Sequence, residues 1–175
     1  MHGVINSTRA FLPHLKARPE SAIVNTSSIF GLLSVPTQSI YHVGKFGVRG
    51  FTESLALEMQ LNNESVEVYS VHPGHIGTNI FSASRFKNFE PGTSLFGEAN
   101  TPEEAGKIFK ENAPTSAKSA AKIILKNIRK KNKRILVGID AHMYDLAQRI
   151  FPKWYIYLLP LIPLIRSLFP KDKIS

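Results

Sequence analysis

The chain has 175 residues, of which 43% are hydrophobic and 20% charged, and it contains no cysteine. This composition is ordinary for one globular domain with a sizeable core, and it excludes a disordered chain, a disulfide framework and a cysteine nucleophile. The first twenty residues lack the basic-then-apolar order of a secretory signal. We therefore expect a cytoplasmic protein.

The formal net charge of +9 is concentrated in one stretch without acidic residues, between Glu111 and Asp140. Within it Lys118, Lys122 and Lys126 recur every four residues, which is typical of the solvated face of a helix. An electrostatic patch for a membrane surface, a phosphorylated ligand or nucleic acid is the alternative interpretation. Because no nucleic-acid motif accompanies these residues, we expect no nucleic-acid partner.

Helical and strand-like patterns alternate along the chain. They predict, in order, helix 1–17, strand 21–27, helix 39–61, strand 66–72, loop 77–101, a short helix opening at Thr101 and Pro102, a basic helix, strand 134–138 and helix 140–151. Strands alternating with helices of about a dozen residues imply a parallel sheet. A doubly wound sheet more often has about six strands. Three strands therefore indicate that part of a larger sheet is missing.

The chain ends in a strongly apolar tail, from Trp154 to Pro170. This tail is too short, and too interrupted by Pro160, Pro163 and Arg166, to span a bilayer comfortably. Its role stays open between packing in a core or dimer interface, covering a substrate, and contacting a membrane at its interface.

Tyr41 and Lys45 are four residues apart in a predicted helix, so their side chains share one face. A neighbouring ammonium stabilises a phenolate, which suits a tyrosine to acid/base chemistry near neutral pH. Ser28, thirteen residues before Tyr41, follows a predicted strand at the edge where open α/β sheets bind ligands. Two hydroxyl donors on one substrate oxygen would polarise a carbonyl for hydride attack.

The next predicted strand ends in His72-Pro73-Gly74-His75. A Pro-Gly turn lets the backbone approach a flat ligand closely. His72 and His75 could be read as a metal pair, but no third ligand is evident, so we interpret them as loop histidines and expect no metal site.

The run IVNTSSIFGLLSVPTQSIYHVGKFGVRGFTESLALEM, with the later VHPGHIGTNI, closely resembles short-chain dehydrogenases/reductases. The serine-to-tyrosine spacing, the Tyr-x-x-x-Lys pair, and the Pro-Gly followed by Ile and Thr occur together, which makes the match specific. The resemblance is strong over residues 1 to about 80 and moderate at KRILVG. It implies an α/β fold: the carboxyl-terminal half of a doubly wound, Rossmann-like parallel sheet, with about three parallel strands and flanking helices.

The resemblance also implies a role for each site residue. Tyr41 would be the general acid for carbonyl reduction and the base for alcohol oxidation. Lys45 would support Tyr41 and hydrogen-bond the nicotinamide ribose, and Ser28 would orient the substrate oxygen. A further group would cradle the nicotinamide of NAD or NADP: Pro73, Gly74, Ile76 through its backbone, and Thr78.

Two departures from the family pattern concern the cofactor-binding half. The glycine-rich phosphate loop Thr-Gly-x-x-x-Gly-x-Gly is absent from the sequence, and the family's catalytic asparagine would fall one position before Met1. We therefore expect residues 1–151 to be a partial catalytic domain lacking its nucleotide-binding half, followed by the apolar segment 152–175.

The implied activity is hydride transfer between a nicotinamide cofactor and a hydrophobic alcohol or ketone, by a protein that is a homo-oligomer when complete. Apolar residues after Ser28 (Ile29, Phe30, Leu33, with Gln38) and in the loop 79–100 (Ile80, Phe81, Phe86, Phe89, Phe96) suggest a hydrophobic substrate, although ordinary loop packing explains them equally well. The alternative function is a catalytically inactive fragment that acts as a dimerisation or interaction module. Association with a membrane through the tail is a further option.

Overall fold

A three-stranded parallel sheet forms the centre of the molecule. The computed structural model describes residues 1–36, 38–84 and 99–158. The strands are β1 (Ser21–Thr26), β2 (Val66–Pro73) and β5 (Arg134–Val137), in the order β1-β2-β5. Ile23 of β1 pairs with Val68 of β2, and Val71 of β2 pairs with Ile135 of β5. The predicted parallel sheet is confirmed, and each predicted strand ends within one residue of the observed one.

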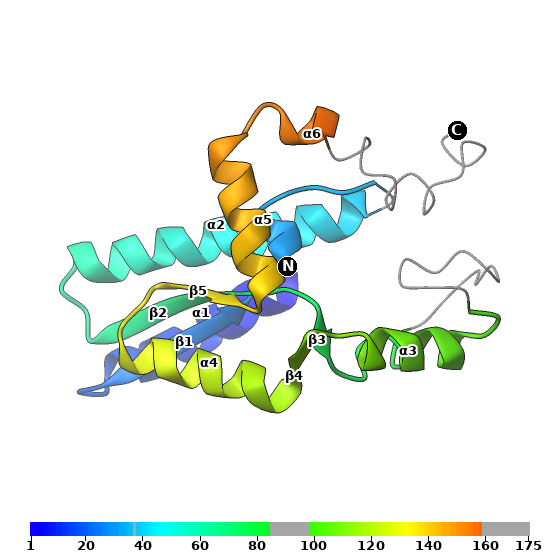
Figure 1. Ribbon diagram of the computed structural model, residues 1–175. Helices are drawn as coiled ribbons and strands as arrows, with labels where there is room; N and C mark the ends of the chain where they lie inside the picture. Colours follow the sequence, from blue (N-terminus) through cyan, green and yellow to red (C-terminus); the bar gives the residue numbers. More distant parts are fainter. Residues whose placement is uncertain (37, 85–98, 159–175) are drawn as a thin grey trace.

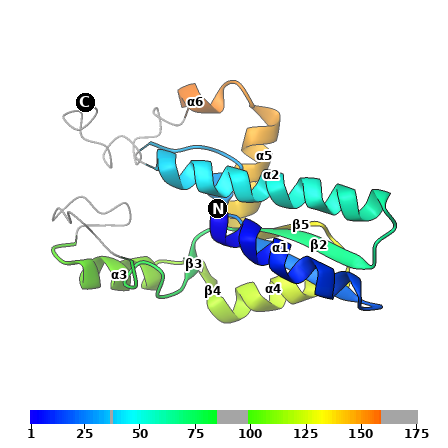
Figure 2. The same ribbon diagram turned by 180° about the vertical axis from the view of Figure 1, so that it is seen from behind.

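Helices cover both faces of this sheet (Figure 1). They are α1 (His2–Lys16), α2 (Ser39–Leu61), α3 (Pro102–Glu111), α4 (Ala117–Arg129), α5 (Ile139–Ile150) and the short α6 (Tyr155–Leu158). In both views α2 and α4 lie on opposite sides of the strands, while α3 extends away from the end of the sheet (Figures 1 and 2).

The core consists of two apolar clusters, one on each face of β2. One cluster joins strand residues to α2, and its members are Ile23, Leu55, Met59, Val66 and Val68. The other joins strand residues to α4, and its members are Tyr69, Val71, Ala120, Ile135 and Val137. Alternate residues of a strand point to opposite faces, so the continuous apolar run of β2 supplies both clusters. This central strand places its carboxyl end between the two neighbouring strands.

Side-chain caps fix the starts of α3 and α4. Thr101 Oγ1 accepts a hydrogen bond from the Glu104 amide at 3.1 Å, and Pro102 occupies the first turn, as the sequence predicts. Ser116 Oγ accepts from the Ser119 amide at 3.2 Å. The lysines at positions 118, 122 and 126 are exposed on α4, which confirms the solvated basic face.

The chain forms a second, short sheet from residues on either side of the predicted loop 77–101, which the sequence did not indicate. β3 (Ile76–Gly77) pairs in parallel with β4 (Thr115–Ser116), forming a second, two-stranded sheet. Segments of two residues are too short for a recognisable period. Residues 85–98 of that loop, and the tail from residue 159 onward, lie outside the described residues. None of the described helices is long and apolar enough to cross a membrane.

Candidate functional site

Ser28 lies directly beyond the carboxyl end of β1 and caps the following helical turn, η1 (Ile29–Gly31). Its side chain is buried, and its Oγ accepts a hydrogen bond from the Phe30 amide at 3.1 Å. A hydroxyl that accepts through one lone pair keeps its own proton to donate. Ser28 is therefore held in place with its donor available.

Tyr41 and Lys45 lie one turn apart near the start of α2, on the same side of the helix. The Lys45 ammonium nitrogen stands 5.5 Å from the centre of the Tyr41 ring, and it donates to the Thr26 carbonyl at 3.1 Å. Burial lowers the pKa of Lys45. The Tyr41 side chain stays 40% exposed and meets the edge of the Phe30 ring, with ring centres 6.1 Å apart. The structure thus gathers Ser28, Tyr41 and Lys45 around Phe30 and the end of β1.

Close packing fixes the loop between Ser28 and Tyr41 against α2. Ser27 Oγ donates to the Lys45 carbonyl at 2.8 Å. A side chain at Gly31 would meet this contact, since its Cβ would lie 2.8 Å from the Lys45 carbonyl oxygen. Only glycine lets the η1 backbone come this close to α2.

His42 is a positioning residue that sequence reasoning missed. It is buried beneath the loop. Its Nδ1 lies 2.8 Å from the Phe30 carbonyl, and its Nε2 accepts from the Val35 amide at 2.9 Å. The sequence around His42 does not distinguish a buried histidine from an exposed one, so only the folded structure identifies this contact.

The turn after β2 is held by a second unexpected residue, Asp140, in the first turn of α5. The Gly74 amide donates to the Val137 carbonyl at 2.9 Å, and the His75 amide donates to Asp140 Oδ2 at 2.5 Å. A Cβ at Gly74 would collide with the Asp140 carboxylate, so glycine is required for this approach. Asp140 follows Gly138, whose φ of 105° bends the chain from β5 into α5. An acidic residue just after a strand and a glycine is the sequence signal that could have indicated it.

The four residues expected to cradle a ligand lie together in this turn. Pro73 ends β2, and Gly74 follows it. Ile76 lies in β3, where its side chain packs against the β2–α4 cluster. The Thr78 amide donates to the Ile76 carbonyl at 2.8 Å. Because β1 and β2 are parallel, this turn and Ser28 lie at the same edge of the sheet.

His72 links the two halves of the site, and its interpretation as a loop histidine is wrong. It lies within β2 and is 0% exposed. Its Nδ1 stands 3.2 Å from the Ser28 carbonyl, and its Nε2 lies 2.9 Å from Ser70 Oγ. Burial lowers the pKa of His72 to about 4. Among the described residues no group of three or more His, Cys, Asp or Glu side chains is placed to hold a metal ion.

Two of the residues expected to face a substrate are core residues instead. Ile29 and Leu33 are both buried. Phe30, from the same loop, does lie beside Tyr41. Residues 86, 89 and 96, whose aromatic side chains entered the same expectation, lie outside the described residues.

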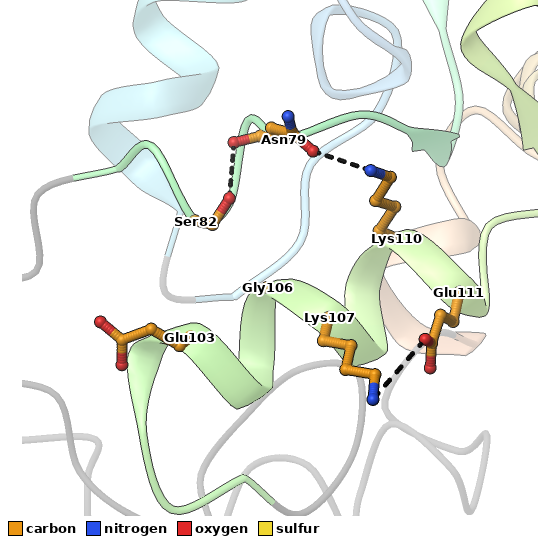
Figure 3. A pocket seen from close by; sticks show the side chains of 7 residues that line it. All are labelled: Asn79, Ser82, Glu103, Gly106, Lys107, Lys110 and Glu111. Carbon is orange, nitrogen blue, oxygen red and sulfur yellow. Dashed lines mark hydrogen bonds and ion pairs between the residues drawn. The ribbon is translucent and has the colours of Figure 1, made fainter.

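A separate hollow of about 550 Å³ lies between α3 and the segment that follows β3 (Figure 3). Its lining is Asn79, Ser82, Glu103, Gly106, Lys107, Lys110 and Glu111. Lys110 reaches across and donates to Asn79 Oδ1 at 3.1 Å. Ser28, Tyr41 and Lys45 do not line this hollow, so it belongs to the outer end of the turn and not to the serine–tyrosine–lysine group.

Comparison with curated proteins finds relatives among oxidoreductases. The chain is 38% identical over 154 residues to the SadH protein of Mycobacterium tuberculosis, which is named as an oxidoreductase; the match covers 87% of this chain and 52% of that protein. It is 34% identical over 108 residues to cyclopentanol dehydrogenase of Comamonas, with coverage of 59% and 42%. The chain thus spans about half the length of the curated relatives it matches.

Two solved structures share the fold. A short-chain dehydrogenase/reductase from Burkholderia phymatum in complex with NAD superposes with a TM-score of 0.67 at 24% identity, covering 99% of this chain and 58% of that one. A short-chain dehydrogenase from Burkholderia cenocepacia in complex with NADP gives a TM-score of 0.65 at 20% identity, covering 90% and 56%. These likenesses confirm the expected Rossmann-like fold class.

The short chain dehydrogenase family model matches residues 1–88, which contain the strands and helices that carry Ser28, Tyr41, Lys45 and the turn after β2. This chain therefore belongs to the short-chain dehydrogenase family.

Proposed function

We propose that this protein is a nicotinamide-dependent oxidoreductase that interconverts a hydrophobic alcohol and its ketone, with Tyr41 as the general acid and base. The observation that carries the proposal is the gathering of Tyr41, Lys45 and Ser28 at the carboxyl edge of a parallel sheet. Lys45 Nζ stands 5.5 Å from the Tyr41 ring centre there, and Ser28 is fixed by the turn beside them. Family membership and the oxidoreductase names of the relatives support it.

The proposed roles follow from what each side chain can donate. In carbonyl reduction the Tyr41 hydroxyl would give its proton to the substrate oxygen, while the Ser28 hydroxyl donates a hydrogen bond to the same oxygen. In alcohol oxidation Tyr41 would take that proton back. Lys45 would hold the tyrosinate by charge. Its ammonium is already fixed by the Thr26 carbonyl, so little conformational freedom is lost when a ligand binds.

A nicotinamide nucleotide fits the donors at this edge of the sheet. The Lys45 ammonium can reach ribose hydroxyls, and the side chain of Thr78 is partly exposed in the turn that Asp140 holds. We assign Pro73, Gly74, the backbone of Ile76, and Thr78 to the nicotinamide end of the cofactor, which would supply or accept the hydride. Complexes of fold neighbours with NAD and with NADP support both forms.

The substrate is proposed to be a hydrophobic secondary alcohol or the matching ketone. Cyclopentanol dehydrogenase and cyclohexanol dehydrogenase are among the relatives, at 34% and 32% identity. The Phe30 ring beside Tyr41 offers an apolar surface next to the proposed acid. The two curated alcohol dehydrogenases and this ring together favour an apolar substrate.

The first experiment tests cofactor binding and turnover on this chain. Fluorescence titration with NADH and with NADPH measures binding, and the absorbance of the reduced nicotinamide measures oxidation of cyclohexanol and cyclopentanol. Tyr41→Phe should lower kcat by about 10²- to 10⁴-fold and leave cofactor binding nearly unchanged, because only the transferable proton is lost. Retained turnover in this variant would contradict the acid/base role. A chain that neither binds the nucleotides nor turns over would sink the enzymatic proposal.

We further propose that the protein self-associates and that its carboxyl-terminal segment contacts a membrane interface. Ile139, Met143, Leu146 and Ile150 follow each other at spacings of four, three and four along α5, and all are exposed. Sedimentation of Leu146→Asp tests the self-association.

The proposed membrane contact rests on Trp154, which is exposed before α6 and is the only tryptophan of the chain. A blue shift of tryptophan emission on anionic vesicles tests this contact.

A further inference from the structure

His72 is a buried titratable group that the proposed chemistry leaves without a role. It lies in β2 one residue before Pro73, beyond the last β1–β2 pair, Thr26 with Val71. At this point β1 has left the sheet, so no strand partner holds Ser28. The His72 ring crosses the gap instead, and its Nδ1 lies 3.2 Å from the Ser28 carbonyl oxygen.

The contacts of the ring define its proton positions. The Ser28 carbonyl can only accept, so Nδ1 must carry the proton and donate. Nε2 then accepts from the Ser70 hydroxyl, 2.9 Å away. A neutral ring in this single tautomer satisfies every polar atom in a site that is 0% exposed.

We propose that His72 is a positioning residue, which fixes the backbone of Ser28 through its Nδ1–H bond to the Ser28 carbonyl and so sets the direction of the Ser28 hydroxyl. This inference rests on the proposed function for its catalytic consequence, while the bond itself can be tested without activity. The carbonyl accepts from His72 Nδ1 at 3.2 Å and from the Gly31 amide at 3.0 Å, and the Oγ accepts from the Phe30 amide at 3.1 Å. Ser28 is thereby clamped on both sides of its Cα, and only its O–H is left to act on a ligand.

The charges packed around His72 favour the neutral ring overall. Arg134 on β5 and Arg49 on α2 both oppose a positive charge at this site, while Glu53 on α2 favours one. Burial is the main cause that lowers the pKa of His72 to about 4, and the two arginines add to it. The Nδ1–H donor is therefore present through the neutral range, and the bond to Ser28 does not depend on pH there.

The first test reads the tautomer in this chain by nitrogen NMR of the histidine side chains. We expect His72 to carry its proton on Nδ1 and to stay neutral from pH 8 down to about pH 5. In His72→Leu the Ser28 amide and Cβ resonances should shift, and in His72→Asn, which keeps an amide donor near the position of Nδ1, they should shift less. His14→Leu, at an exposed position on α1, is the matched control. A His72 that is protonated on Nε2, or that titrates near pH 6.5, would overturn the proposal.

The second test uses kinetics and a double-mutant cycle. His72→Leu should lower kcat on the order of 10- to 100-fold with the KM for cofactor little changed, and His72→Asn should restore much of the loss. In a Ser28→Ala background the same His72→Leu change should have almost no further effect on kcat, because the two residues act through one hydroxyl. Independent, multiplicative losses would refute the coupling. If the unmodified chain shows no turnover, the proposed function fails, and the NMR result alone decides the role of His72.

Discussion

The serine side and the turn side of the site are held in different ways. On the serine side, formed by β1, η1 and the start of α2, the groups proposed to react are side chains, and contacts to backbone carbonyls fix this side: Lys45 binds the Thr26 carbonyl and His72 binds that of Ser28. On the turn side, between β2 and β3, the groups expected to meet a ligand are backbone atoms. There the carboxylate of Asp140 takes up the His75 amide.

The difference shows how each side of the site can be rigid and still leave available the groups proposed to contact a ligand. The proposed hydroxyl donors must stay available, so the hydrogen bonds that fix this side go to backbone carbonyls, and one of them holds the Lys45 ammonium itself. A backbone cradle needs its shape fixed, so the fold supplies the half-buried carboxylate of Asp140 and a glycine, Gly74, that leaves room for it. His72 connects the serine side to the turn side, since it lies in β2, the strand that leads into the turn, and hydrogen-bonds the Ser28 carbonyl. Each half should therefore fail in its own way when its anchor is removed.

Acid should destabilise the protein through His72, and this is the largest stability effect we expect. The pKa of His72 is about 4 in the folded protein, below its ordinary value of 6.5, so between these pH values the unfolded chain takes up a proton that the folded chain refuses. This stability is fully present above pH 6.5 and is lost as the pH falls toward 4, by roughly 3 kcal/mol. Urea unfolding of the wild type and His72→Asn at pH 7 and pH 4.5 measures it. Equal losses in the two proteins would contradict this assignment.

Gly31→Ala should disrupt the packing of η1 against α2 on the serine side. The new Cβ would lie 2.8 Å from the Lys45 carbonyl oxygen and would also meet Ser27 Oγ, so η1 must move away from α2. We expect a loss of about 2 kcal/mol in the free energy of unfolding, together with a lower kcat. The matched control is Gly50→Ala, whose Cβ meets nothing within 4 Å and which should gain about 0.5–1 kcal/mol of helix stability. A Gly31→Ala protein as stable as the control would show that the loop is not tightly packed.

Asp140→Ala should loosen the turn side while sparing the serine side. The His75 amide would lose its acceptor, which costs about 1–2 kcal/mol in the free energy of unfolding if the amide stays buried. Hydrogen exchange at His75 should accelerate, and in an active protein the KM for the cofactor should rise more than kcat falls. Asp140→Asn keeps an acceptor oxygen and is expected to retain most of the protection. Unchanged exchange in the alanine variant would remove Asp140 from this role.

Glu111→Gln should have the smallest effect and marks the edge of the site. The Lys107–Glu111 pair spans 4.0 Å on α3, and both side chains are largely exposed. Exposed pairs of this kind contribute at most about 0.5 kcal/mol. Thermal unfolding at low and high salt should show almost no difference from the wild type. A clear fall in cofactor or substrate binding would instead bring the hollow beside α3 into the site.

Local patterns predicted the regular elements well. The helix 39–61 has the bounds observed for α2, and the strands were placed to within a residue at each end. These elements carry strong periodicity or a continuous buried run, and their signal lies within a few neighbouring residues. The pair β3–β4 was missed because its partners are 39 residues apart, as in Ile76 with Thr115, and each strand is two residues long.

The sequence by itself determined the family, through the resemblance of its motif residues, and the parallel sheet, through its alternating strand and helix patterns. It also indicated that Ser28, Tyr41 and Lys45 lie at the edge of that sheet, because spacing along a strand and a helix places side chains in a known way. Only the tertiary structure decided what holds them. His42, His72 and Asp140 act through backbone atoms that are distant in the sequence or offer no pattern, such as the Ser28 carbonyl 44 positions away from His72. Every residue carries a backbone carbonyl, so the residue type of the partner does not indicate such a hydrogen bond. The contacts that hold this site can therefore be identified only in the folded chain.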